Sequence, residues 1–149
     1  MSLLSEPARP HDLEPALALL RDADLPIEGV VEQFGHFFVV KDGWLLVGLC
    51  GLEVHGEDGL LRSLVVAPTY RGEGLAGLLV SAVLTLARKM ELRTVYLLTT
   101  AARGYFDGLG FTSCARADAP AAIRESWEFK AGCPLSSELM LKPVAAERA

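Results

Sequence analysis

The spacing of apolar residues changes along the chain and separates helical segments from strands. Leu13, Leu17 and Leu20 recur at steps of three and four, as on one face of a helix, and Asp12 is expected to cap its start. The longest helical period begins at Leu75. The pattern predicts helices after Asp12 and over residues 27–34, 75–90 and 101–109, the last ended by Gly110; residues 123–129 are either helical or irregular.

Short apolar runs bounded by turn residues predict the strands. Asp42-Gly43 is a strong hairpin signal, and polar and glycine residues at 55–59 form the next loop. The first three predicted strands follow one another as an antiparallel meander. The predicted strands are residues 36–41, 44–54, 60–66 and 94–100, a segment that begins at Phe111, and residues 137–144.

The order of the central elements defines the fold class. A strand at 60–66, a turn, a helix at 75–90 and a strand at 94–100 follow one another, which is typical of a right-handed parallel crossover. No repeat or linker-like composition interrupts the 149 residues, a length that fits one domain. We therefore expect a single α/β (α+β mixed sheet) domain over residues 1–149, with an antiparallel N-terminal meander and a central β-α-β crossover.

Composition and charge narrow the expected partners. Fourteen Lys and Arg stand against 19 Asp and Glu, for a formal net charge of -5. This charge argues against nucleic acid and anionic membrane, but not against a small anion that is held locally. No segment stays apolar for the about 18 residues of a membrane span. Cys50, Cys114 and Cys133 are scattered, so we expect reduced thiols, no metal site and a cytoplasmic protein, with a turn at Cys133-Pro134.

A glycine-rich segment, Arg71-Gly72-Glu73-Gly74-Leu75-Ala76, joins the strand 60–66 to the helix 75–90. The first N–H groups of a helix have no intrahelical partner, and the helix dipole is positive there. Gly72 and Gly74 permit positive φ, so successive N–H groups can converge on phosphate oxygens. On the glycines alone, the favoured interpretation is a tight strand-to-helix turn that needs glycine only for packing. The spacing fits neither a nucleoside triphosphate loop nor a dinucleotide fingerprint.

The residues around this turn resemble a known family. The segment Leu64 to Ala76, with Arg71-x-x-Gly74-x-Ala76 at its end, closely resembles the acetyl-CoA-binding motif of the GNAT N-acetyltransferases. Downstream, Tyr105-Phe106-Asp107-Gly108-Leu109-Gly110-Phe111 resembles the short helix of that family that ends in Gly-Phe. The resemblance implies the GNAT fold and transfer of an acetyl group from acetyl-CoA, used as cosubstrate without a metal, to an amine.

A finer resemblance extends over nearly the whole chain. Leu61-Arg62-Ser63-Leu64, Leu97-Leu98-Thr99-Thr100 and the tail from Arg116 to Lys142 are similar to the N-acetyltransferases associated with arsenic-resistance operons. Some relatives of that branch acetylate arsinothricin or phosphinothricin, which mimic glutamate. The resemblance therefore implies a small-molecule acceptor, such as an amino acid or a glutamate mimic. A homodimer is common in the family.

The resemblance also assigns the residues that hold the cosubstrate. The main chain of the strand 60–66 would pair with the pantetheine arm, and the glycine-rich segment would bind the diphosphate. The thioester carbonyl would meet a strand N–H where the strand 60–66 diverges from the strand 94–100, a donor that would stabilise the developing oxyanion. The predicted cofactor-binding residues are Leu64, Val65, Val66, Arg71, Gly72, Glu73, Gly74, Leu75, Ala76 and Phe106.

The sequence departs from the family at the general acid. Many members carry a tyrosine four residues before the glycine that ends the helix, whereas this chain has Phe106 there. Tyr105 lies one position earlier, about 100° around a helix. Because an α-amine titrates near a pKa of about 8 and a thiol near about 8.5, the reaction needs little acid or base assistance. The catalytic candidates, each of which can equally be an ordinary polar residue, are Glu53, His55, Ser63 and Tyr105.

Arginines are the side chains expected to hold an acidic acceptor, since the guanidinium fork matches paired oxygens. Arg62 is the first candidate because it flanks the predicted acetyl site, and Arg116 and Arg124 come next. Thr99 ends a buried strand beside the predicted groove. Two other functions stay open: a protein lysine or N-terminal acetyltransferase, and a catalytically weak acetyl-CoA-binding sensor. The sensor is suggested by Phe106, which stands where many family members have the tyrosine.

Overall fold

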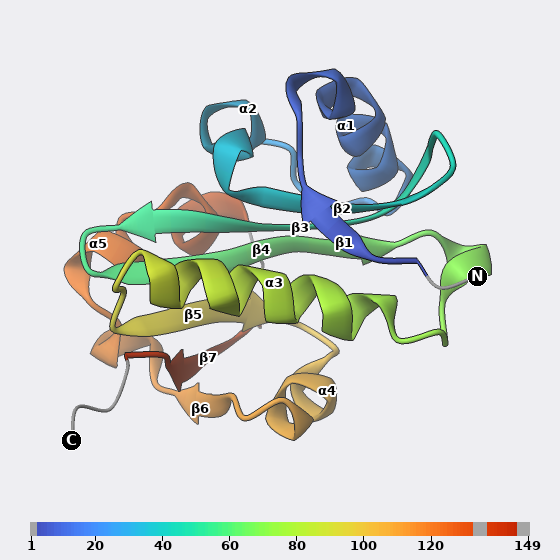
Figure 1. Cartoon of the computed structure of the whole chain (residues 1–149). Coiled ribbons are helices and arrows are strands. Elements are labelled where there is room, and N and C mark those ends of the chain that lie inside the picture. The colour runs from blue at the N-terminus through green and yellow to red at the C-terminus, as the bar shows by residue number, and fades with distance from the viewer. Residues whose placement is uncertain (1–2, 133–136, 146–149) are drawn as a thin grey trace. The chain divides into compact units, whose positions relative to one another are not determined.

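A computed structural model describes residues 3–132 and 137–145 of the chain (Figure 1). The strands of these residues form one seven-stranded mixed sheet in the order β1-β2-β3-β4-β5-β7-β6, which confirms the predicted fold class. The predicted turn at Cys133-Pro134 lies outside the described residues. The strands are β1 (Ser5–Pro7), β2 (Phe37–Asp42), β3 (Leu45–His55), β4 (Asp58–Val66), β5 (Thr94–Thr99), β6 (Thr112–Cys114) and β7 (Glu138–Pro143).

The helices agree with the apolar periods except where a glycine or a turn interrupts them. Only part of the predicted helix 27–34 is α-helical, because Gly29 stands at its start with a φ of 82° and helical backbone begins after it. Residues 123–129 were predicted as helical or irregular: residues 123–124 end α5, residues 125–127 lie between the helices, and residues 128–129 begin a π-helical turn, η5 (Glu128–Gly132). The α-helices are α1 (Leu13–Asp22), α2 (Val30–Gln33), α3 (Leu75–Lys89), α4 (Arg103–Gly108) and α5 (Ala121–Arg124).

The edge strand β1 was not predicted from the sequence. Its residues Ser-Glu-Pro show no apolar alternation, yet they pair antiparallel with β2 at Ser5↔Val40 and Pro7↔Phe38. A proline is tolerated there because an edge strand has one row of backbone groups without a neighbouring strand. Such a strand carries no hydrophobic signal for sequence analysis to find.

The central crossover is present as predicted. β4 and β5 run parallel, with Asp58 opposite Thr94 and Leu60 opposite Tyr96, and α3 connects them. β5 then pairs antiparallel with β7 from Thr94↔Pro143 to Thr99↔Glu138. The sheet therefore changes from antiparallel to parallel at the pair that brackets the glycine-rich segment.

The described chain divides into two compact units. The first comprises residues 1–53 and 61–86, and the second comprises residues 54–60 and 87–149, so that β4 contributes to both. The prediction that all 149 residues act as one domain stays a prediction. Each unit has its own apolar cluster, and that of the second unit contains Leu60, Tyr96, Ala119, Ile123 and Leu139.

In the first unit the strands are covered on both faces (Figure 1). The side chains of α1, α2 and the facing strands form one buried cluster that includes Leu20, Val30 and Phe37. α3 packs against the opposite face, where a Cβ on Gly48 would lie 3.1 Å from the Leu79 side chain. This close approach of α3 to β3 holds the start of the helix in place behind the glycine-rich segment.

The predicted capping role of Asp12 is wrong. Its side chain makes no cap hydrogen bond to α1; instead Oδ2 accepts from the N–H of Arg9 at 2.8 Å, and Oδ1 lies 2.8 Å from Nζ of Lys41. Burial raises the pKa of Asp12, but the hydrogen bond and charge of Lys41 and the Arg9 N–H outweigh it and hold that pKa below its ordinary value. A buried ion pair to β2 has therefore displaced the local cap.

Candidate functional site

Residues 71–74 of the glycine-rich segment lie exposed before α3, in the conformation that the glycines permit. Gly72 and Gly74 have φ of 83° and 81°, in the left-handed region. A Cβ added at either glycine would meet no atom within 4 Å. Packing is therefore not what requires glycine here; the backbone conformation is. The space beside both residues is open, so a phosphate can approach the N–H groups.

Two hydrogen bonds fix the chain that enters this turn. Nε of Arg71 donates to the carbonyl of Val66 at 3.1 Å, which ties the arginine back to the end of β4. The hydroxyl of Tyr70 donates to Asp42 at 2.6 Å, and Asp42 is the last residue of β2. Within the described residues, the two Nη groups of Arg71 donate to no protein atom. The guanidinium thus has an anchored stem and an outward-facing end.

Strand β4 is irregular one residue before its predicted cofactor segment. Ser63 has a φ of 61°, a left-handed conformation that is uncommon for any residue other than glycine and rare inside a strand. The residues of β4 from Asp58 to Arg62 are all buried, Ser63 and Leu64 are half-buried, and Val65 and Val66 are buried again. We assign a β-bulge at Ser63 on this backbone conformation, because a left-handed residue inside a strand is typical of a bulge, which interrupts ladder pairing.

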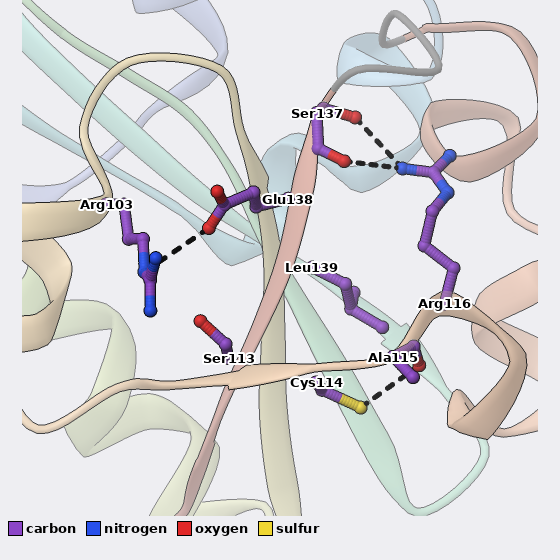
Figure 2. Close-up of a pocket in the computed structure, with 8 residues that line it drawn as sticks. All are labelled: Arg103, Ser113, Cys114, Ala115, Arg116, Ser137, Glu138 and Leu139. Atoms are coloured by element: carbon purple, nitrogen blue, oxygen red, sulfur yellow. Dashed lines mark hydrogen bonds and ion pairs between the residues drawn. The ribbon is translucent and has the colours of Figure 1, made fainter.

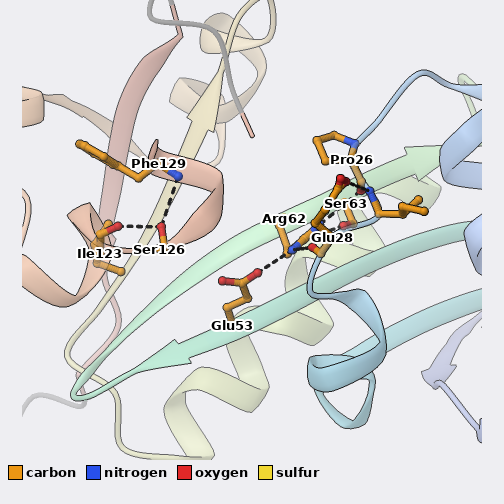
Figure 3. Close-up of polar contacts among 9 residues, drawn as sticks. Pro26, Glu28, Glu53, Arg62, Ser63, Ile123, Ser126 and Phe129 are labelled. Atoms are coloured by element: carbon orange, nitrogen blue, oxygen red, sulfur yellow. Dashed lines mark hydrogen bonds and ion pairs between the residues drawn. The ribbon is translucent and has the colours of Figure 1, made fainter. Parts of the chain in front are cut away.

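Arg62 is buried and bound to oxygen atoms of the protein (Figure 3). Its Nη1 lies 2.6 Å from Glu53 Oε2 and donates at 2.6 Å to the carbonyl of Glu28. Its Nε donates to Ser63 Oγ at 3.0 Å, and its Nη2 to the carbonyl of Pro26 at 3.3 Å. The side chain is 1% exposed. Through these hydrogen bonds, the guanidinium joins β3, the bulge and the segment before α2. Direct contact with an acceptor stays a prediction.

The two base candidates on β3 differ in their surroundings. Glu53 is 5% exposed and is engaged by Arg62, whereas His55 is half-buried near the end of the strand. The 2.6 Å contact commits one oxygen of the Glu53 carboxylate to Arg62. Glu53 therefore suits a structural role better than proton abstraction, and the catalytic role of His55 stays a prediction.

Phe106 and Tyr105 lie on α4 in the second unit. Phe106 is 6% exposed and packs edge-on against Phe111, with ring centroids 5.7 Å apart. Tyr105 is 43% exposed and meets Phe106 edge-on at 5.3 Å. The expectation that their side chains point differently is confirmed. Phe106 is a core residue of this unit; contact with a cofactor arm stays a prediction.

The remaining acceptor candidates also lie in the second unit. Thr99 Oγ1 accepts from the N–H of Ala102 at 3.0 Å, close to the start of α4, and Arg124 is exposed at the end of α5. Arg116 donates from Nη1 to the carbonyl and hydroxyl of Ser137 at 2.9 and 3.0 Å. Its guanidinium also lies 4.7 Å over the ring of Phe129. The side chain of Arg116 also lines a cavity.

That cavity has a volume of about 400 Å³ (Figure 2). Arg103 and Glu138 form an ion pair of 3.3 Å at its edge, and both are largely exposed. Burial raises the pKa of Cys114, so the thiol is protonated at neutral pH. Two arginines against one carboxylate favour a small anion. The lining residues are Arg103, Ser113, Cys114, Ala115, Arg116, Ser137, Glu138 and Leu139.

The described residues offer no site for a metal ion: they contain no group of three or more His, Cys, Asp or Glu side chains that could hold one. No described helix is long and apolar enough to cross a membrane. Cys50 and Cys114 are free thiols. The functional candidates are therefore the glycine-rich segment and residues 61–66 of β4 in the first unit, and the cavity in the second.

Some features of the site carry no signal in the sequence. The left-handed Ser63 has none, since serine is common in strands and turns alike. The carbonyls of Pro26 and Glu28 bind Arg62 from more than 30 residues away, and backbone groups leave no trace in residue type. The Asp42–Tyr70 hydrogen bond has a weak signal, because Asp42-Gly43 was predicted as a turn but its partner was not.

The sequence of this chain is similar to those of known proteins. The acetyltransferase (GNAT) domain family matches residues 33–113, a range that includes β4, the glycine-rich segment, α3 and α4. The uncharacterized protein YwlB of Bacillus subtilis (strain 168) is 31% identical over 108 residues, which are 70% of this chain and 73% of that protein.

Two solved structures are similar in fold. N-acetylglutamate synthase from Neisseria gonorrhoeae, complexed with coenzyme A and N-acetyl-glutamate, has a TM-score of 0.85 at 17% identity, over 98% of this chain and 36% of that one. Rv2747 from Mycobacterium tuberculosis, in complex with CoA and NLQ, has a TM-score of 0.79 at 24% identity, over 93% of this chain and 97% of that one. This chain spans about a third of the synthase, and at these identities the likeness concerns the fold alone.

Proposed function

The chain belongs to the GNAT acetyltransferase family, and we propose that it acetylates the amino group of a small acidic molecule of the amino-acid class. As a member of that family it is an N-acetyltransferase that takes the acetyl group from acetyl-CoA. The finer statements, on the acceptor and on the roles of single residues, are proposals. The observation that carries the donor side is the open, left-handed backbone at Gly72 and Gly74.

The glycine-rich segment fits the diphosphate of coenzyme A. Its N–H groups lie at the N-terminus of a 15-residue helix, where the helix dipole favours an anion. A side chain at Gly72 or Gly74 would fill the space that a phosphate needs. The outer Nη groups of Arg71 add a positive charge beside that space. Leu64, Val65 and Val66 on β4 would align the pantetheine arm by main-chain pairing.

The bulge at Ser63 supports a role for β4 in the chemistry. When bound, acetyl-CoA supplies a thioester whose acetyl carbon accepts the amine and whose thiolate leaves. A bulge releases main-chain groups from ladder pairing, and a released N–H is the kind of fixed donor that stabilises an oxyanion. An α-amine with a pKa of about 8 is partly neutral at physiological pH, so no strong base is required. The commitment of Glu53 to Arg62 agrees with this view.

The acidic class of acceptor rests on two supports. The similar synthase from Neisseria gonorrhoeae was solved with N-acetyl-glutamate. Two arginines and two serines of this chain line a cavity of about 400 Å³. A glutamate mimic of the arsinothricin or phosphinothricin type carries comparable acidic groups and belongs to the same proposal. Assignment to the arsenic-resistance branch is a proposal on the sequence resemblance alone.

The test is a thiol-release assay with purified protein, acetyl-CoA and a panel of amines. We expect turnover with glutamate or with phosphinothricin, and little with neutral amino acids of similar size. Turnover of peptides with a free N-terminus or lysine, without turnover of free amino acids, would instead identify a protein acetyltransferase. Tight acetyl-CoA binding with no turnover of any amine would identify a sensor.

Glu73 provides a separate test of the diphosphate site. It is an exposed carboxylate between the two glycines, where a negative charge opposes a phosphate. Glu73→Lys is expected to tighten CoA binding about fivefold at low ionic strength, and the gain should shrink as salt screens it. Titration calorimetry at two salt concentrations measures both effects. Glu14→Lys, an exposed change of the same charge on α1, should leave the affinity unchanged; equal affinities in both variants would remove Glu73 from the phosphate site.

A further inference from the structure

The guanidinium of Arg62 is hydrogen-bonded to atoms from three places in the chain (Figure 3). Glu53 Oε2 on β3 and the carbonyl of Glu28 lie 2.6 Å from Nη1. The carbonyl of Pro26 accepts from Nη2, and the hydroxyl of Ser63 accepts from Nε at 3.0 Å. Charge-assisted hydrogen bonds of this kind are roughly twice as strong as neutral ones. The arginine therefore fixes all three places relative to one another.

The neighbouring backbone is shaped to receive this arginine. Gly29, with a φ of 82°, comes so close that an added Cβ would lie 3.1 Å from Nη1 of Arg62 and 3.5 Å from Glu53 Oε2. The thiol of Cys50, on β3, donates to the carbonyl of Arg62 at 3.6 Å. Side-chain and main-chain atoms of Arg62 are thus both held, immediately before the bulge.

The bulge needs such constraint. A residue other than glycine in the left-handed region costs on the order of 1–3 kcal/mol, and the conformation persists only where its surroundings impose it. Ser63 is held on its side chain by Nε of Arg62. The strand continues directly into Leu64, Val65 and Val66, whose main chain is proposed to meet the cosubstrate.

We infer that Arg62, fixed by Glu53 and by the carbonyls of Pro26 and Glu28, is a positioning residue that holds the Ser63 bulge, so that a main-chain N–H of residues 64–66 points at the thioester carbonyl. The inference rests on the proposed function, because the thioester belongs to acetyl-CoA. In this role the side chain of Arg62 acts through the backbone of β4. Ser63 contributes through its conformation and Glu53 through its charge.

The test reads the thioester carbonyl directly. Infrared difference spectra of acetyl-CoA labelled with carbon-13 at the carbonyl, bound to the full chain, report hydrogen bonding as a downward shift of the stretching frequency. We expect such a shift in the wild-type protein. In Arg62→Lys the frequency should return toward that of free acetyl-CoA. In that variant the affinity for acetyl-CoA should fall about fivefold to tenfold, as for one lost hydrogen bond, while the affinity for CoA stays within about twofold.

A rescue variant separates this role from a merely structural one. Glycine adopts positive φ without strain, so Ser63→Gly in the Arg62→Lys background should restore the carbonyl shift. Ser63→Val, with a β-branched side chain that resists this conformation, should abolish the shift with Arg62 intact. Glu53→Gln keeps the shape of the pair and weakens its charge, and it replaces Arg62→Lys if that variant does not fold. Arg21→Lys, an exposed change on α1, is the matched control.

The outcomes are distinguishable. If the wild-type protein binds neither CoA nor acetyl-CoA, the proposed function is wrong and the inference falls with it. If acetyl-CoA binds and is turned over without a carbonyl shift, the function stands and the inference is overturned. The inference is also overturned if Arg62→Lys and Glu53→Gln leave the shift unchanged. It is overturned as well if Ser63→Gly does not restore the shift.

Discussion

Gly74→Asp is expected to abolish binding of CoA, with a dissociation constant raised at least about 100-fold. Three effects act together. The carboxylate occupies the space beside the turn in which a Cβ now meets no atom, and its charge repels the diphosphate. The φ of 81° is also strained for any residue with a Cβ. Titration calorimetry with CoA measures the loss directly and requires no acceptor.

Gly56→Asp is the matched control for this variant. Gly56, in the turn between β3 and β4, has a φ of 66°, and a Cβ there would also meet no atom within 4 Å. The same charge and a similar strain are introduced outside the glycine-rich segment. Thermal unfolding should show comparable destabilisation of the two variants, while only Gly74→Asp loses the ligand. Retained CoA binding in Gly74→Asp would disprove the assignment of the turn.

Gly51→Ala is expected to destabilise the protein by about 3 kcal/mol, at the upper end of the usual cost of overpacking a core. Gly51 on β3 stands opposite Phe37 on β2, and the phenyl ring lies over it. A Cβ at Gly51 would lie 2.3–2.5 Å from three ring atoms of Phe37. Phe37 is 1% exposed in the cluster beneath α1 and α2, so the ring has little room to move.

Urea unfolding of two further variants decides whether this clash is the cause. Gly35→Ala adds a methyl group where no atom lies within 4 Å and φ is not in the left-handed region, so it should change stability little. Phe37→Leu removes the ring edge that the new Cβ would meet. The double variant should therefore be less destabilised than the sum of its single changes, by an interaction of about 1 kcal/mol or more. Additive effects would show that Phe37 is not the obstacle.

The predictions from sequence succeeded where one residue pattern decides one element. The strand β3 and the helix α3 lie within two residues of their predicted bounds, because a long apolar period leaves few alternatives. The glycine-rich turn also followed from local chemistry, since positive φ and glycine go together. Prediction failed at β1, whose pairing depends only on backbone groups, and at Asp12, where a lysine 29 positions away outcompeted the local cap.

The contacts of the acceptor candidates could not be predicted from their residue types. Arg62 was predicted to hold the acceptor, but residue type alone does not distinguish an arginine that faces a ligand from one that binds carbonyls of its own chain. Arg116 is likewise bound to Ser137 and Phe129. Partners 13 to 36 positions away decide these orientations, and no spacing rule encodes them. The predicted roles of Thr99 and Arg124 stay predictions.

The hydrogen bond that anchors the stem of Arg71 affects the association and dissociation rates of the ligand differently. A free arginine loses about 2 kcal/mol of rotamer freedom when a ligand immobilises it. Here Nε is already bound to the carbonyl of Val66, so much of that loss has been taken during folding rather than during binding. Arg71→Lys keeps the charge but releases the stem. Its charge can still attract the diphosphate on approach, so the cost should fall mainly on the dissociation rate, giving a shorter-lived complex.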